Sequence, residues 1–205
     1  MRGGKGENER SIAGPARARY YADVSNRTVA LLVDAVLLTV VVFVAAIVVS
    51  VLIGPAVEFN SAADTVQDAV TVDRGVATVD AMLSILLSAA YFAWSWMALG
   101  GSPGQRLMGM RVGAEASGAQ LTTGQALVRW ALLGAPFGIA ALITTAFSGP
   151  GNTAVNVMMI AWYALLLVTT ARSPTKQGVH DRIARTVVSK EASPVPWDRP
   201  GVDAR

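Results

Sequence analysis

The sequence predicts an all-α integral membrane protein with four membrane-spanning helices, short cytoplasmic surface helices and a small two-stranded sheet. Three observations predict this class. Of the 205 residues, 53% are hydrophobic and only 15% are charged, whereas average soluble domains carry roughly 25% charged residues. The chain contains long apolar segments of membrane-spanning length. Its basic residues are concentrated in alternate segments between these helices, as the topology of a membrane protein requires.

The first predicted helix, residues 27–53, is a long apolar run with two charged residues near its start, Arg27 and Asp34. They lie seven residues apart, about two helical turns, and therefore share one helix face. Residues 35–53 carry no charge, which is close to the about 20 residues that a spanning helix needs. This count places Asp34 at the edge of the hydrocarbon layer and Arg27 among the headgroups.

Three further helices follow, at residues 80–99, 125–147 and 153–171. Gly54 and a proline end the first helix, and a tight turn at 148–152 separates the last two. Near the end of the second helix, the rings of residues 91, 94 and 96 predict an interfacial aromatic belt. In the third helix, Gly134 and Gly138 form a GxxxG motif that favours close helix packing, and Pro136 between them predicts a kink.

Two segments outside the helices resemble each other, SPGQRLMGMRVGA from Ser102 and SPTKQGVHDRIARTVVS from Ser173. Each predicts a short surface helix and then a strand, which is consistent with a weak internal repeat. In the first segment, Ser102 and Gln105 predict a capping box. We expect residues 110–112 to pair with residues 186–188 in a small sheet. Alternatively, residues 110–114 form a local hairpin with residues 119–122.

The basic residues predict the orientation of the chain. Six lie before the first helix or at its first residue, and seven follow the fourth helix. Three belong to the region of the second loop, Arg106, Arg111 and Arg129, whereas the first loop has one and the third has none. The positive-inside rule therefore predicts cytoplasmic termini. We expect a membrane domain at residues 20–190, between disordered cytoplasmic tails at 1–19 and 191–205.

The composition also excludes several classes of protein. There is no cysteine, and His180 is the single histidine, which excludes disulfides, thiolate metal sites and multi-histidine clusters within one chain. We expect no metal, no cofactor and no enzymatic activity, because no phosphate-binding loop or catalytic arrangement is present. Anionic lipids on the cytoplasmic side explain the basic segments better than nucleic acid does.

Three motifs in order, Arg27 with Asp34, SPGQRLMGMRV, and KQGVHDRIARTVV, resemble the RDD family of bacterial membrane proteins over residues 24–189. The family is named for an arginine and two aspartates, which the resemblance identifies here as Arg27, Asp34 and Asp181. Ser102 and Gln105 depart from the usual Thr-Pro-Gly-Lys motif and remove a positive charge. The resemblance implies a bacterial plasma-membrane location. It also implies transport of an unidentified ligand, with cation–proton exchange in some members and an accessory role in others.

An ionised carboxylate at a lipid boundary needs a partner or water. We therefore predict a shared cytoplasmic cluster that contains Arg27, Asp34, Asp181 and one of Arg106 or Arg182. The cluster is either a structural ion-pair site or a proton or cation site. Four helices with one membrane carboxylate make a poor pathway, so transport predicts a homo-oligomer. The alternative is an accessory or scaffold role beside a partner membrane protein.

His180 is adjacent to Asp181, but neighbouring residues on a helix point about 100° apart, so the pair is not a catalytic dyad. A structural role is the simpler reading. If His180 is buried beside Asp181, its pKa approaches physiological pH and the residue becomes a sensor of cytoplasmic acidity.

Overall fold

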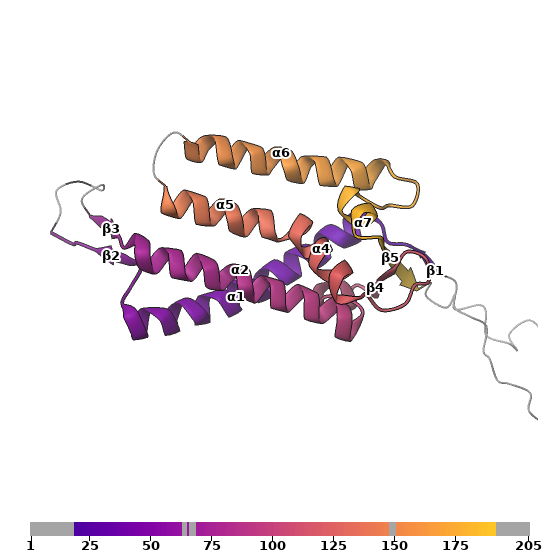
Figure 1. The fold of residues 1–205 in the computed structure, drawn as a ribbon, viewed down its shortest axis with the longest axis horizontal. Helices are drawn as coiled ribbons and strands as arrows, with labels where there is room; N and C mark the ends of the chain where they lie inside the picture. The colour runs from indigo at the N-terminus through magenta and orange to yellow at the C-terminus, as the bar shows by residue number, and fades with distance from the viewer. Residues whose placement is uncertain (1–18, 63–64, 66–68, 148–150, 192–205) are drawn as a thin grey trace, which may run out of the picture.

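The computed structural model describes residues 19–62, 65, 69–147 and 151–191, which form a mostly helical bundle (Figure 1). Its helices are α1 (Val24–Ile53), α2 (Arg74–Leu99), α3 (Pro103–Leu107), α4 (Thr123–Leu133), α5 (Ala135–Ala146), α6 (Gly151–Arg172) and α7 (Val179–Ile183). Its strands are β1 (Arg19–Tyr21), β2 (Val57–Phe59), β3 (Val70–Val72), β4 (Met110–Ala114) and β5 (Thr186–Glu191). The tails at 1–18 and 192–205 and the turn at 148–150 lie outside the described residues, whereas Arg19 and Glu191, which we assigned to the tails, belong to strands.

Three helices, α1, α2 and α6, are long and apolar enough to cross a bilayer. Large apolar side chains remain exposed along α1, for example Val36 at 65% and Phe43 at 64%. Exposed apolar surface of this extent is unfavourable in water and is suited to lipid. Helix α2 begins six residues before the predicted start at Asp80, because the Asp73 carboxylate caps the helix by accepting the backbone N–H groups of Gly75 and Val76.

The third predicted helix is broken into α4 and α5, which meet at an angle of 50°. Pro136 lies in the first turn of α5, and its missing N–H leaves the carbonyl of Leu132, four residues earlier, without a helical donor. Two side chains of α6 bind the carbonyls at this break: the indole N–H of Trp162 donates to Leu132 at 3.0 Å, and the hydroxyl of Tyr163 donates to Leu133 at 2.7 Å. The predicted kink is therefore a complete break that α6 stabilises.

The predicted strand pair is confirmed, within a larger sheet. Strands β4 and β5 are antiparallel, with Val112 opposite Val188, and β1 pairs with the other edge of β5 to give the order β1-β5-β4. The predicted hairpin partner at 119–122 is not a strand. Instead, the backbone N–H of Ala114 donates to Ala119 within a short turn, and β4 pairs with β5 alone among the described strands.

The two Ser-Pro segments fold in the same way. Each follows a long helix with a short helix and then a strand, α2–α3–β4 and α6–α7–β5, and the two strands are neighbours. The capping box of α3 is present as predicted, with Ser102 and Gln105 each accepting from the other's backbone N–H. The similarity of the two segments in the sequence therefore corresponds to a structural repeat.

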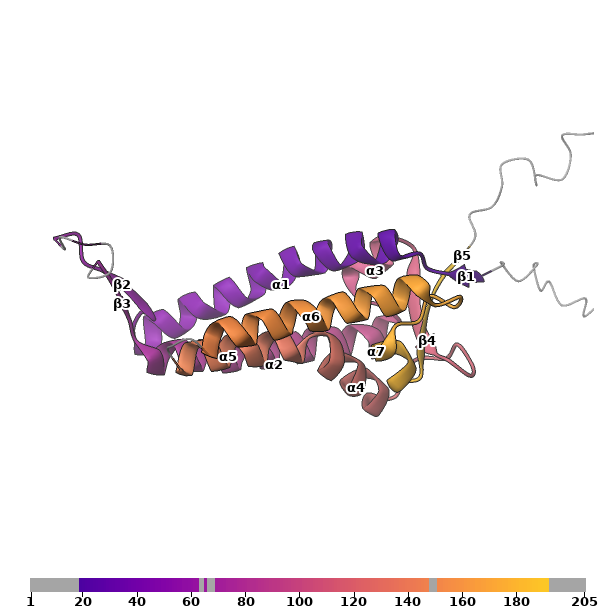
Figure 2. The ribbon, with the colours of Figure 1, turned by 90° about the horizontal axis from the view of Figure 1, so that it is seen from above.

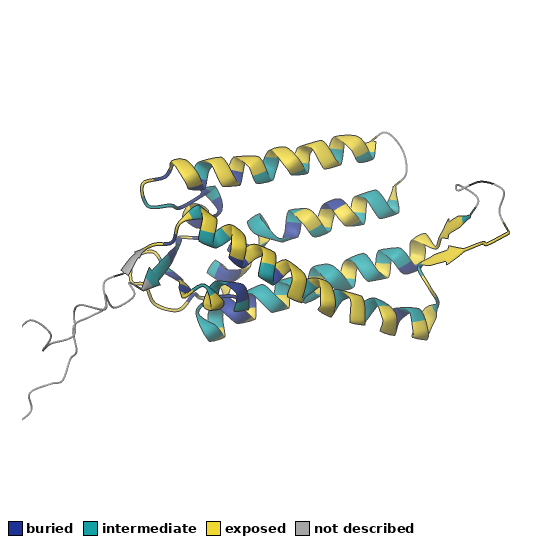
Figure 3. Ribbon diagram, turned by 180° about the vertical axis from the view of Figure 1, so that it is seen from behind, coloured by how far each residue is buried: buried dark blue, intermediate teal, exposed yellow. Residues whose placement is uncertain are grey.

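The three-stranded sheet and the β2–β3 hairpin lie at opposite ends of the bundle, which we call the sheet end and the hairpin end (Figures 1 and 2). Most of the buried apolar core is at the sheet end, where side chains from the sheet meet α1, α2 and α4; it includes Trp96, Met110 and Val188. The predicted aromatic belt is partly wrong, because Trp96 is only 2% exposed whereas Trp94 is 59% exposed. Figure 3 shows that exposed surface dominates along α1 and α6, whereas α2 is mostly half-buried.

Candidate functional site

Asp34 lies on α1 and is 2% exposed. Its carboxylate accepts hydrogen bonds from the hydroxyl of Tyr91 and the backbone N–H of Gly104, both at 2.8 Å, and from the hydroxyl of Ser102. Ser102 is the N-cap of α3, so Asp34 binds the start of this short helix, where free N–H groups favour negative charge. All three donors are neutral, and no hydrogen bond in the described part of the chain joins Asp34 to a cation.

Gly104 allows α3 to approach α1 closely enough for these bonds. A Cβ atom at this position would lie 2.2 Å from the carbonyl oxygen of Ala30 and 3.0 Å from the carboxyl carbon of Asp34. Such distances are far below van der Waals contact, so only glycine fits between the two backbones. The Asp34 site thus depends on residues of α1, α2 and α3.

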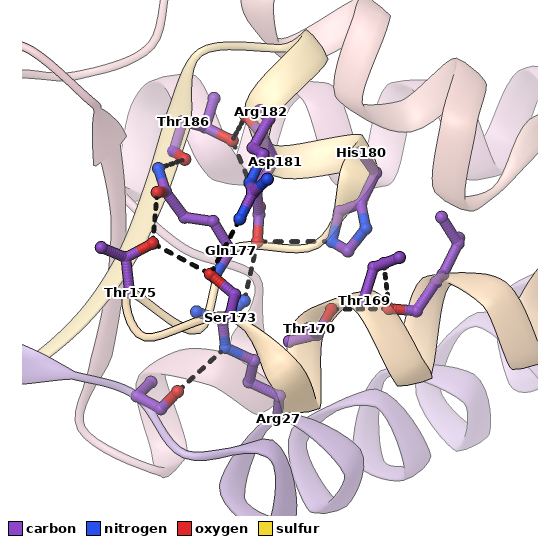
Figure 4. A network of polar contacts seen from close by, with 12 residues as sticks. Arg27, Thr169, Thr170, Ser173, Thr175, Gln177, His180, Asp181, Arg182 and Thr186 are labelled. Carbon is purple, nitrogen blue, oxygen red and sulfur yellow. Dashed lines mark hydrogen bonds and ion pairs between the residues drawn. The ribbon is translucent and has the colours of Figure 1, made fainter.

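Asp181 lies on α7 and is completely buried. The guanidinium of Arg27 on α1 donates to one carboxylate oxygen at 2.8 Å, and that of Arg129 on α4 donates to the other. The hydroxyl of Thr186, at the start of β5, lies 3.3 Å from the same carboxylate oxygen as Arg129. Figure 4 shows the part of this network that joins Arg27 to Asp181, two residues that lie far apart in the sequence. Asp181 therefore joins α1, α4 and α7.

The charges in this second network do not balance among its described members. Two guanidinium groups face one carboxylate, and the Nη2 of Arg27 and the Nε of Arg129 are buried without a hydrogen-bond partner. Arg129 also lies over the ring of Trp96, with its Cζ 5.0 Å from the ring centroid, and this contact stabilises a desolvated cation. Burial raises the pKa of Asp181, but Arg129, His180 and Arg27 outweigh burial and hold the pKa at about 2.

His180 lies beside Asp181, with its Nε2 3.5 Å from the carboxylate. Its Nδ1 is buried without a partner. Burial, together with the positive charges of Arg129 and Arg27, lowers the pKa of His180 to about 4 despite the nearby carboxylate. This shift is away from physiological pH, so the geometry favours a neutral, structural histidine over the predicted pH sensor.

The predicted single cluster is corrected to two networks. Arg27 and Asp181 meet, but Asp34 is bound by donors of α2 and α3, because two helical turns separate it from Arg27 and α3 packs against it. Arg106 is exposed. Arg182 is also exposed, and its guanidinium donates to Ser173 at 3.3 Å. Neither arginine takes the predicted place in an ion pair with the two aspartates.

Sequence reasoning missed Arg129 and Tyr91. We counted Arg129 among loop cations, although a lone charge early in an apolar helix is itself a signal of a buried partner. Tyr91 was assigned to the aromatic belt, and no local pattern distinguishes that role from a bond to Asp34. Gly138 packs as predicted, since a Cβ there would lie 2.5 Å from Ile85 of α2, whereas the space at Gly134 is occupied by Trp130 of its own helix.

Comparison with known proteins gives a single assignment. The sequence model of the RDD family matches residues 21–185. No curated protein and no solved structure matches the chain. Among the described residues, no group of three or more histidine, aspartate or glutamate side chains is placed to hold a metal ion.

Proposed function

Since the chain belongs to the RDD family and is a multi-pass membrane protein, we propose that it moves a small ligand or cation across a bacterial plasma membrane, in exchange for protons. The observation that carries this proposal is the environment of Asp34. It is an almost fully buried carboxylate within a membrane helix, and its three donors are neutral. A proton or a small cation would neutralise its charge, whereas two arginines already neutralise Asp181.

The orientation and the partners are part of the proposal. If α4 and α5 together form one span, the chain crosses the bilayer four times. All basic-rich described segments then lie at the sheet end, which supports a cytoplasmic sheet end and anionic lipids around it. Asp34 is almost fully buried within one copy of the chain, so we propose that a homo-oligomer completes the pathway.

Reconstitution into liposomes with a proton-sensitive dye tests the proposal. We expect cation-dependent proton flux with the wild type and its loss in Asp34→Asn, which removes the charge with little change in size. Asp23→Asn is the matched control, because Asp23 is exposed outside the site, and this variant should keep the flux. Absence of flux in folded wild-type protein would contradict transport.

A non-enzymatic accessory or scaffold subunit is the second candidate, and the hairpin favours it. The pairing of β2 with β3 places four exposed apolar side chains on one face: Val57, Phe59, Val70 and Val72. An isolated two-stranded hairpin is marginally stable, and its exposed Glu58 favours a partner with an apolar patch and a basic rim. Purification of a stoichiometric membrane partner, together with no flux from the chain alone, would support this candidate.

A further inference from the structure

Helix α2 is the central helix of the bundle, since it packs against α1, α4 and α5. One face of α2 carries a line of polar residues, which we call the α2 polar line: Asp80, Ser84, Ser88, Tyr91 and Ser95. Their spacing of three or four residues places them on one side of the helix. Met82 and Leu86 lie on the opposite side, where they are 55% and 64% exposed. The polar face of α2 is therefore directed into the protein.

Asp80 is the second acidic residue within a membrane span. It lies six residues after the start of α2, about 9 Å along the axis. Its Oδ1 is buried and has no hydrogen-bond partner in the described part of the chain. A carboxylate in this environment is unfavourable unless it binds a proton, a cation or water. The networks of Asp34 and Asp181 do not use Asp80.

The hydroxyls of the line continue from Asp80 toward Asp34. Ser84 and Ser88 donate to carbonyls of their own helix at 2.7 and 2.9 Å, so their oxygens can still accept a bond, as Ser88 does from Trp130 at 3.2 Å. Tyr91 then donates to Asp34. Successive hydroxyls lie about 6 Å apart along the axis, a gap that one bridging water spans.

Ser95, at the last position of the line, gives an independent indication. Its side chain is 1% exposed, and its hydroxyl has no hydrogen-bond partner among the described residues. A serine hydroxyl within a helix can donate to a carbonyl of the preceding turn, as Ser84 does. An unpartnered, fully buried hydroxyl on the same face is suited to bind water or a cation.

Asp80 and Asp34 reduce the length of apolar layer that a proton or cation would have to cross. Asp80 and Tyr91 are eleven residues apart, about 16 Å along the axis, whereas the hydrocarbon layer is about 30 Å thick. We propose that Asp80 is a second proton- or cation-binding residue of the transport route. Ser84, Ser88 and Tyr91 line a hydrated path from it to Asp34. The inference rests on the proposed transport function and assigns its route.

Single-cysteine accessibility tests the path independently of transport, because the natural chain contains no cysteine. Ser84→Cys, Ser88→Cys and Ser95→Cys would be treated in liposomes with a small cationic methanethiosulfonate reagent. Met82→Cys and Leu86→Cys on the opposite face are the controls. Such reagents attack the thiolate, which forms in contact with water, so the line should react about tenfold faster or more. Equal, slow reaction on both faces would overturn the path.

Proton flux tests Asp80 itself. Asp80→Asn should lose cation-dependent flux, and Asp80→Glu should keep part of it. Thr28→Val, which removes an exposed hydroxyl of α1 that donates within its own helix, should keep all of it. Retention of full flux in Asp80→Asn would overturn the role of Asp80. If the wild type shows no flux but the line cysteines react rapidly, the transport proposal fails while the hydrated path is supported.

Discussion

Asp34 and Asp181 are both buried carboxylates at the sheet end, but their environments have different energetic consequences. Removing Asp181 would leave two buried guanidinium groups without a counter-charge, and breaking a buried pair in this way costs about 3–5 kcal/mol. Removing the charge of Asp34 leaves no buried cation without a counter-charge, because its three donors are neutral. Asp181 is therefore suited to hold the fold together, whereas the charge of Asp34 does not balance a buried cation.

The pH dependence of stability should reveal His180. Its pKa is lowered from 6.5 to about 4 in the folded protein, so between these values the unfolded chain binds more protons. Stability is therefore complete above about pH 6.5 and falls by about 3 kcal/mol as the pH drops to 4. Unfolding in detergent at a series of pH values should show this loss in the wild type.

His180→Gln should lose less stability over the same range, because glutamine does not titrate. NMR provides a direct check, since a single histidine gives one set of imidazole signals. An imidazole that titrates near pH 6.5 in the folded protein would contradict the buried, neutral His180 described above.

At the scale of the elements, two short helices dock against long ones through glycine. In α3, Gly104 lies against Ala30 of α1. Before α7, Gly178 lies against Thr170 of α6, where a Cβ atom would come within 2.3 Å of the threonine hydroxyl. In both copies of the repeat, a glycine therefore allows a short helix to pack closely against a long one. Each of these contacts positions an aspartate network at the sheet end.

Gly104→Ala should destabilise the protein and disrupt the Asp34 site. The added methyl group would overlap the backbone of Ala30, and overpacking of this kind costs about 1–3 kcal/mol or more. Gly124→Ala is the control, because no atom lies within 4 Å of a Cβ at that helical position, and alanine there should be neutral or slightly stabilising. Thermal unfolding in detergent measures both, and equal melting temperatures would exclude a tight α1–α3 contact.

The sequence predicted the secondary-structure elements better than it predicted the contacts between them. Apolar runs located the long helices, and Ser102 with Gln105 located the cap of α3, because these signals are local. The break at Pro136 was underestimated, since its extent depends on Trp162 and Tyr163 of α6. Strand β1 and the partners of Asp34 were missed for the same reason. A pairing across 57 residues, as between Asp34 and Tyr91, leaves no local pattern.

At the scale of the whole molecule, the fold places the sheet and both aspartate networks at one end and the hairpin at the other. This polarity is the basis of the proposed orientation. Ser61, in the β2–β3 connection, and Ser117, between β4 and α4, are both exposed. They are a matched pair of positions on opposite ends.

Cysteine labelling in intact cells should show which end of the bundle faces the outside of the cell. Ser61→Cys should react with a membrane-impermeant maleimide added outside, whereas Ser117→Cys should react only after the membrane is opened. This outcome follows from a cytoplasmic sheet end. The reverse pattern would invert the topology, and labelling of both positions from outside would contradict the single span, α2, between them.

The central position of β5 has a consequence for the order in which the protein can mature. A ribosome makes Arg27, Arg129 and both outer strands before it reaches Asp181 and β5. The long helices can therefore enter the membrane while two arginines still lack their carboxylate and two strand edges remain unpaired. A nascent chain that stops before Asp181 would keep these features exposed. Completion of the chain is thus coupled to closure of the sheet end, and a quality-control protease could recognise the unfinished protein there.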